Sequence, residues 1–394
     1  MLPDMLRPRR ILTLSAMALT LAGCCPCNKP PPRTGPGTQP ASRPALPVAG
    51  APELELVESV PVETNWDQAD VRDTQRVWLE MIGRARRTLD VAQFYFAHKE
   101  GQALAPVLAA LEQAAARGVK VRVLAEKKFL RISKDTLARL EQKKNIEVAI
   151  FDLSRSTGGI LHAKYFIVDR REVFVGSQNM DWRALTHIHE IGVRVRSTEL
   201  ALTLWRVFEA DWQKMKHGRD TYGQRVVDRD RDGLPDGLDP RPDVPTWAPR
   251  PGARPALLYL VASPPSLEPR GIIYSGKRLV QLLDGAKKSV VIQLLNYSVT
   301  TYGGGRWHLI DHALRRAAKR GVKIRMNLSH WTKKRAYIKS AQDLARVPNI
   351  TIKLNTIPPH SGGFIPYARV DHSKYMVVDG RTAWVGTRDR KSVV

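Results

Sequence analysis

The sequence predicts an α/β protein made of two similar halves, each a mixed β-sheet flanked by helices on both faces, with a pseudo-twofold axis between the halves. First, the motif H-x-K-x4-D occurs at His162 and again at His372, 210 residues later (372 − 162). Second, AAARGVKVR at 114–122 is matched by AAKRGVKIR at 317–325. Third, an amphipathic stretch in each copy ends at a glycine and runs directly into a β-branched segment, as in a βαβ unit.

Residues 1–23 predict an export signal. Three arginines precede the apolar run Ile11–Leu21, which is too short to span a bilayer. The run ends in Leu-Ala-Gly-Cys, which resembles a bacterial lipobox, so we expect Cys24 to be lipidated and to become the first mature residue. The alternative is an ordinary signal peptide with an incidental cysteine. We expect a lipid-anchored protein of the bacterial cell envelope, at the outer membrane or the periplasmic face.

Residues 24–52 are expected to form a tether behind the lipidated cysteine. They are rich in Pro, Gly, Ser and Thr and cannot bury a core. No cysteine follows Cys27, which excludes a cysteine nucleophile and disulfide bonds from the exported body.

The first half is expected to cover residues 53–220 and the second 251–387. In each, the helix that ends at Gly118 or Gly321 is followed by two strands, and the second strand leads through a loop to the histidine motif. We therefore expect a mixed, partly parallel sheet in each half.

The insertion at 221–250 contains an aspartate-rich loop. Its acidic residues follow the ligand spacing of an EF-hand loop, with Gly233 at the turn, and predict a structural calcium ion. An acidic turn without metal is the alternative, because Asp replaces the usual final Glu and Pro235 is atypical. The predicted calcium ligands are Asp228, Asp230, Asp232, Asp236 and Asp239.

The histidine motifs carry the predicted chemistry. Residues two apart on a strand face the same way, so each histidine and its lysine project together, whereas the aspartate has the other parity and is better placed to fix geometry. Two histidines that converge on one phosphorus allow a two-step displacement through a phosphohistidine, and no metal or other cofactor is needed for catalysis. The motif residues predicted to form the catalytic centre are His162, Lys164, Asp169, His372, Lys374 and Asp379.

Longer strings around the motifs, GSQNMDWRALTHIHEIGV and FIPYARVDHSKYMV, indicate a family. Over about residues 53–387 the chain resembles the phospholipase D superfamily, and within it the branch of lysosomal 5′ exonucleases and poxvirus envelope phospholipases. The resemblance implies that Ser177 and Asn179 line the phosphate site, that Thr387 supports it, and that Glu190 orients His162. A plain surface charge is the alternative for Glu190.

The end of the sequence departs from the family pattern. Asp389 stands where the resemblance implies Asn, and the second counterpart of Glu190 would fall at position 400 (372 + 28), beyond the chain. We expect the second lobe to be incomplete and residues 388–394 to be a non-native tail.

The net charge of +25 predicts anionic partners, although any single basic cluster, such as 315–325, also fits a solvated helix face. The leading interpretation is a phosphoric diester hydrolase acting on single-stranded nucleic acid. The alternatives are a phospholipid hydrolase or transphosphatidylase, and an inactive lipoprotein that binds phosphate or anionic surfaces. The sequence gives no oligomeric state, but a monomer is sufficient for a two-motif site.

Overall fold

The computed structural model describes residues 54–152, 159–222, 258–264, 269, 272–300 and 305–387. All of them belong to one compact unit, Ala49–Val394. The predicted signal peptide, Cys24, the tether, the five aspartates of the calcium loop and the tail at 388–394 lie outside the described residues. Across the described ranges, no helix has both the length and the apolar character needed to cross a bilayer.

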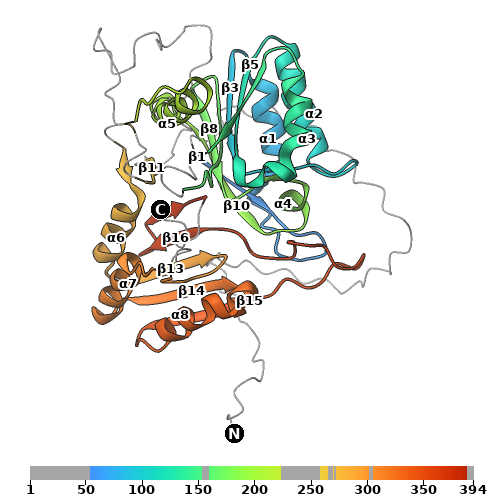
Figure 1. The fold of residues 1–394 in the computed structure, drawn as a ribbon. Coiled ribbons are helices and arrows are strands. Elements are labelled where there is room, and N and C mark those ends of the chain that lie inside the picture. Colours follow the sequence, from blue (N-terminus) through green and yellow to red (C-terminus); the bar gives the residue numbers. More distant parts are fainter. Residues whose placement is uncertain are drawn as a thin grey trace, which may run out of the picture. The chain divides into compact units, whose positions relative to one another are not determined.

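The first half is built on an eight-stranded mixed sheet in the order β2-β1-β10-β8-β7-β3-β5-β6 (Figure 1). β3, β5 and β6 are parallel, whereas β7, β8, β10 and β1 follow as antiparallel neighbours. The strands are β1 (Leu54–Ser59), β2 (Arg72–Asp73), β3 (Thr88–Gln93), β5 (Lys120–Glu126), β6 (Ile146–Phe151), β7 (Lys164–Val168), β8 (Glu172–Gly176) and β10 (Glu190–Arg196). The short strands β4 (Phe96–Ala97) and β9 (Met180–Asp181) pair separately.

Helices cover both faces of this sheet, as predicted. Side chains of α1, α2 and α3 share one core with residues such as Val91 and Val121, whereas α5 packs into a second core with Ala92 and Ile167 on the opposite face (Figure 1). The strand alternation of inward-facing residues accounts for both cores. The helices are α1 (Thr74–Arg84), α2 (Ala105–Ala116), α3 (Leu130–Glu141), α4 (Trp182–Thr186) and α5 (Thr198–His217), with a 3-10 turn, η1, at Lys127–Phe129.

The second half repeats this plan in the order β15-β14-β13-β16-β17. The register is also repeated: Ala92 lies opposite Tyr165 in the first half, and Gln293 lies opposite Tyr375 in the second. One described core joins α6, α7 and α8 to the sheet. The elements are β11 (Val261–Ala262), β12 (Ile273–Tyr274), α6 (Ser275–Gly285), β13 (Ser289–Leu294), α7 (Leu309–Lys319), β14 (Lys323–Ser329), η3 (His330–Lys333), α8 (Arg335–Ala345), β15 (Ile350–Asn355), β16 (Tyr375–Val378) and β17 (Thr382–Val385).

The predicted glycine stops are confirmed. Helix α2 ends just before Gly118, which has φ +92°, and α7 ends just before Gly321, which has φ +90°. A side chain with a Cβ is strained in this left-handed region, so glycine is the residue that turns each helix directly into the next strand.

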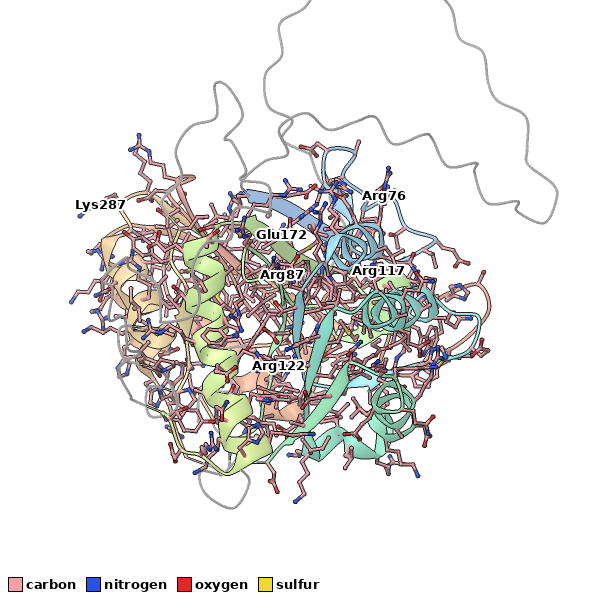
Figure 2. The ribbon with its side chains drawn as sticks, turned by 90° about the horizontal axis from the view of Figure 1, so that it is seen from above. Arg76, Arg87, Arg117, Arg122, Glu172 and Lys287 are labelled. Carbon is pink, nitrogen blue, oxygen red and sulfur yellow. The ribbon has the colours of Figure 1, made fainter. Side chains whose placement is uncertain are left out.

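Part of the positive charge is neutralised inside the fold. Arg122 lies 2.7 Å from both Asp90 and Glu209, and the fully buried Arg194 lies 2.5 Å from Glu172. Figure 2 shows Arg122 and Glu172 over the sheet, whereas the exposed Lys287 projects from the edge. The many exposed cations therefore leave a basic surface for an anionic partner.

Candidate active site

His162 stands at the entrance of β7 and contacts the second half of the chain. Its Nδ1 lies 2.9 Å from the carbonyl oxygen of Thr387, which follows β17. The Nζ of Lys164 lies 3.0 Å from the same Nδ1. The carbonyl oxygen calls for a proton on Nδ1, whereas the ammonium calls for a lone pair there, so the two contacts require opposite tautomers of the neutral ring. Thr387 thus supports the site through its backbone.

Lys164 is buried beside this ring. Its Nζ donates to the carbonyl oxygen of His162 at 3.0 Å and lies 3.3 Å from His162 Nε2. It also lies 4.7 Å from the centre of the Phe94 ring. The predicted common direction of His162 and Lys164 is confirmed. A fully buried ammonium is costly without anionic compensation, so its place beside the histidine suits a site for a phosphate.

His372 is held by a carboxylate from the first half. Its Nδ1 donates to both oxygens of Glu190, at 2.8 and 2.9 Å, and Glu190 is completely buried at the start of β10. The expectation that Glu190 orients His162 is therefore wrong, because its partner is the histidine of the other motif. Lys374, also fully buried, donates through Nζ to the carbonyl oxygen of His372.

Backbone pairing between the halves explains this exchange of partners. The segment before β10 runs beside the segment before His372: the N–H of Arg369 donates to the His187 carbonyl, and the N–H of His372 donates to the His189 carbonyl, each at 2.8 Å. Glu190 therefore emerges next to His372 rather than His162. Each motif histidine contacts the opposite half, which brings both motifs to one interface.

His189 adds an ionic contact to the same interface. Its Nδ1 lies 3.1 Å from Asp371, and its Nε2 lies 3.8 Å from Glu58. Burial lowers the pKa of His189, but the hydrogen bonds to Asp371 and Glu58 outweigh burial and raise the pKa to about 9. The ring is therefore charged at neutral pH and ties the two halves together.

The two motif aspartates bind backbone N–H groups of a neighbouring segment. Asp169 accepts hydrogen bonds from the backbone N–H groups of Arg86, Arg87 and Thr88. Asp379 accepts equivalent bonds from Lys287, Lys288 and Ser289. Both lie at the strand end opposite to the histidine, because strand β7 or β16 runs between them. The prediction that Asp169 and Asp379 are catalytic is therefore wrong, because both aspartates fix the backbone. Their strand parity, opposite to that of the histidines, had indicated this role.

Ser177 and Asn179 lie behind the site. The buried Ser177 exchanges hydrogen bonds with the backbone of Ile191, donating at 3.1 Å and accepting at 3.0 Å. Asn179 donates through Nδ2 to the hydroxyl of Tyr95 at 3.3 Å. Ser177 thus fixes β10 immediately after Glu190, and the contact of either residue with phosphate stays a prediction.

An aromatic cluster beside His162 was missed in the sequence. The Phe94 ring lies 4.4 Å from the His162 ring and 4.3 Å from the Phe129 ring, measured between centroids. Tyr95 donates to Asp181 at 2.9 Å, and burial raises the pKa of the Tyr95 phenol well above its ordinary value. Nothing in the sequence sets Phe94 or Phe129 apart, because an aromatic residue of the core and one beside a catalytic ring look alike there.

A buried lysine beside each motif histidine, with the two histidines at one interface, defines a phosphodiesterase centre, and comparison with known proteins gives its family. Residues 78–212 match the family described as "Cardiolipin synthase, PLD-like domain". The chain is 31% identical over 376 residues to the 5′-3′ exonuclease PLD3 of Rattus norvegicus, covering 85% of this chain and 71% of that protein. It is 32% identical over 375 residues to 5′-3′ exonuclease PLD3 of Homo sapiens, covering 88% and 74%.

The chain therefore belongs to the phospholipase D superfamily and is a phosphodiesterase of that family. Among solved structures, it is similar to the phospholipase D family member Nuc from Salmonella typhimurium, with 20% identity and a TM-score of 0.34. That match covers 42% of this chain and 97% of Nuc.

Proposed function

We propose that this phosphodiesterase cleaves single-stranded nucleic acid through a phosphohistidine intermediate. The observation that carries the proposal is that each motif histidine contacts the opposite half of the chain. His162 contacts Thr387, and His372 contacts Glu190. The exonuclease activity named for the rat and human relatives supports the substrate class.

The chemistry follows from the ring nitrogens. The Nδ1 of His372 donates to the Glu190 carboxylate, so the neutral ring of His372 keeps its lone pair on Nε2. One histidine attacks phosphorus through Nε2, and a P–N bond forms as the P–O bond to the leaving group breaks. The other, protonated histidine gives its proton to the leaving oxygen. It then takes a proton from water, which attacks phosphorus and breaks the P–N bond, so both histidines return to their initial states.

Two lysines supply positive charge during these steps. Lys164 and Lys374 are both completely buried next to their motif histidines. Fixed charges in a site that excludes water stabilise the charge that develops on the phosphoryl oxygens more strongly than solvated ones do. This chemistry needs no metal ion.

Exposed aromatic side chains before the second motif favour a nucleic-acid substrate. Phe364 is 90% exposed and Tyr367 is 73% exposed, and the guanidinium carbon of Arg183 lies 6.0 Å from the Tyr367 ring centre. Aromatic and guanidinium planes stack on unpaired bases without reading their sequence, at about 1–3 kcal/mol per base. Phospholipid is the second candidate substrate, favoured by the predicted lipid anchor at Cys24.

Activity assays in a chelating buffer separate these substrates. The purified chain is given 5′-labelled single-stranded oligonucleotides or phosphatidylcholine and phosphatidylglycerol liposomes. We expect release of nucleotides, loss of that release in His162→Ala, and unchanged release in the exposed control His217→Ala. Release of headgroup alone would replace the nuclease assignment with a phospholipase, and activity on neither substrate would favour the non-catalytic binding lipoprotein.

We also propose that the protein is anchored in the cell envelope through a lipid on Cys24, with calcium stabilising the aspartate-rich loop. Both proposals rest on the sequence motifs. Cys24→Ser is expected to move the protein from the membrane fraction to the soluble fraction, and retention in the membrane would contradict the anchor. Calcium is expected to slow proteolysis between 228 and 239, whereas an equal effect on Asp228→Asn/Asp230→Asn would contradict the loop's role.

A further inference from the structure

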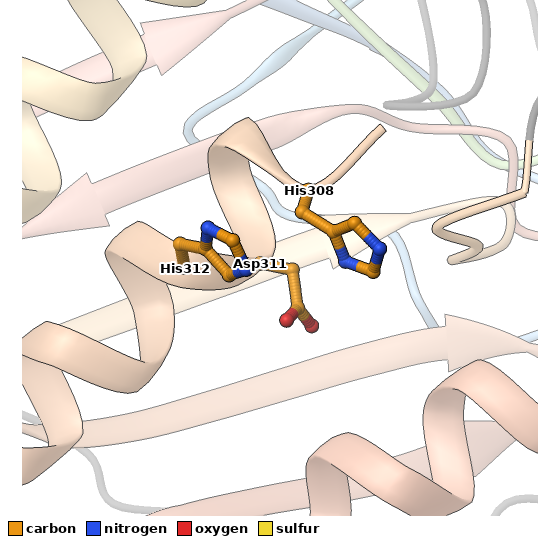
Figure 3. A group of neighbouring side chains, drawn as sticks. All are labelled: His308, Asp311 and His312. Carbon is orange, nitrogen blue, oxygen red and sulfur yellow. The ribbon is translucent and has the colours of Figure 1, made fainter. Parts of the chain in front are cut away.

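A histidine-aspartate-histidine cluster lies at the start of α7, outside the catalytic centre. His308 precedes the first helical residue, and Asp311 and His312 follow three and four positions later. This spacing puts all three side chains on one face of the helix. Figure 3 shows the Asp311 carboxylate between the two imidazole rings, and the candidate ligand atoms all lie within 4.8 Å of one another.

We propose that this cluster binds a divalent transition metal of the zinc class. Two imidazole nitrogens with one carboxylate oxygen suit Zn²⁺, Ni²⁺ or Cu²⁺, whereas Ca²⁺ and Mg²⁺ prefer sites made entirely of oxygen. Tetrahedral zinc with bonds of about 2.0–2.1 Å holds its ligand atoms about 3.4 Å apart. Closing the cluster from 4.8 Å therefore requires a movement of little more than one ångström, which rotation of the histidine side chains provides.

The space around the cluster has room for the ion and another ligand. A cavity of about 240 Å³ is lined by the cluster and by Ser340 and Asp343 of α8. A carboxylate from α8 would complete a four-coordinate site, and the ion would then link α7 to α8. A metal at this place would act as a structural clasp.

The Asp311 carboxylate is held as a metal ligand requires. It is 5% exposed, and it accepts hydrogen bonds from the hydroxyl of Tyr297 at 2.5 Å and from Nε of Arg315 at 2.7 Å. The Tyr297 hydroxyl orients the carboxylate, as outer hydrogen bonds orient metal-bound carboxylates.

The corresponding helix of the first half, α2, lacks these residues. With Gly118 and Gly321 aligned, the cluster corresponds to Ala105, Leu108 and Ala109 of α2. Leu108 is completely buried in the first core. The second half thus places a carboxylate where the first half has a core leucine, and adds a histidine on each side of it, which points to a property specific to α7.

Arg315 provides a sharp test, because it competes with a metal for Asp311. It also lies 2.5 Å from Asp343, so both carboxylates that an ion would use are paired with this guanidinium. Removal of this guanidinium is expected to strengthen metal binding. If the cluster held only ion pairs and no metal, the same removal would weaken it.

The experiment is a calorimetric titration of the full chain with Zn²⁺ after dialysis against a chelator and then against chelator-free buffer. Wild type is expected to bind one more equivalent of Zn²⁺ than His308→Ala/His312→Ala, and His217→Ala is expected to match wild type. His312→Asn, at an exposed position that leaves the core intact, is expected to weaken this site at least tenfold, and Arg315→Gln to tighten it. Ca²⁺ is expected to give no difference between wild type and the double variant.

Equal zinc binding by wild type, the double variant and His312→Asn would overturn the proposal. Because the readout is zinc stoichiometry and affinity rather than turnover, its result is independent of the proposed nuclease activity.

Discussion

At the scale of single residues, the two motif histidines are held by unlike partners. His372 donates to the buried carboxylate of Glu190, whereas Nδ1 of His162 lies against the backbone carbonyl of Thr387. A carboxylate stabilises the imidazolium form more strongly than a carbonyl does, so the pair is chemically asymmetric although the motifs are equal in sequence. Glu190 is a positioning residue, because it acts through His372.

Glu190→Gln is expected to lower kcat about 10–100-fold with little change in KM, because the ring loses its charged partner while the substrate contacts remain. Steady-state kinetics on a single-stranded oligonucleotide provide the measurement. Glu190→Asp should recover part of the activity, and the exposed Glu199→Gln should match wild type. Equal losses in Glu190→Gln and Glu199→Gln would contradict the role.

At the scale of secondary-structure elements, both turns after the motif strands are fixed in the same way. Asp169 and Asp379, each with φ near +50°, accept hydrogen bonds from three consecutive N–H groups that lead into β3 and β13, respectively. These contacts hold the strand that carries each histidine in register with its neighbour.

Asp169→Asn is expected to reduce the free energy of unfolding by on the order of 1–3 kcal/mol, because three backbone donors lose a charged acceptor. Urea unfolding measures this change. The activity of the folded enzyme should stay within about threefold of wild type, since transition-state stabilisation by the histidines is unaffected. Asp135→Asn, on the exposed face of α3, is the control; a large loss of activity at unchanged stability would return Asp169 to the catalytic set.

The backbone pairing between the halves is expected to weaken in alkaline solution because of His189. Its pKa in the folded chain, about 9, lies above the ordinary value of 6.5, so its contribution to stability is complete below pH 6.5 and disappears as the pH rises through 9. The contribution is up to about 3 kcal/mol. Urea midpoints from pH 6 to 10 should fall less steeply in His189→Gln than in wild type, and parallel curves would contradict this assignment.

Many of the helices and strands could be predicted, because two copies of one sequence pattern support the same assignment. The matched strings around Gly118 and Gly321 predicted both βαβ units, and strand parity predicted that His162 and Lys164 would share a direction. The partner of Glu190 could not be read, because spacing along the chain does not show that 187–190 pairs with 369–372 of the other half. Phe94 could not be recognised either, since a buried aromatic just after a strand fits the core equally well.

At the scale of the whole molecule, the excess positive charge is unevenly divided between the interior and the surface. The chain has a net charge of +25, and the buried Arg194 and the half-buried Arg122 are matched by the buried carboxylates Glu172 and Asp90. The excess therefore lies largely on exposed side chains, where it raises the local concentration of a polyanion.

Binding of single-stranded DNA by the inactive His162→Ala variant is expected to weaken at least tenfold between 50 and 200 mM salt. A slope of about −0.7 per neutralised phosphate in a log–log plot means that two to three phosphate contacts suffice for this change. Fluorescence anisotropy of a labelled oligonucleotide measures it. A salt-independent affinity would contradict a phosphate-following surface.

The most direct test of two histidines acting on one phosphorus is to trap the covalent intermediate. The chain is mixed with an oligonucleotide carrying radioactive internal phosphates, without divalent metal, quenched rapidly in alkali, and mapped by peptide. The predicted result is an acid-labile label on His162 or on His372, which disappears when that histidine is replaced by alanine. Turnover with no labelled protein, or a label on any other residue, would contradict the mechanism.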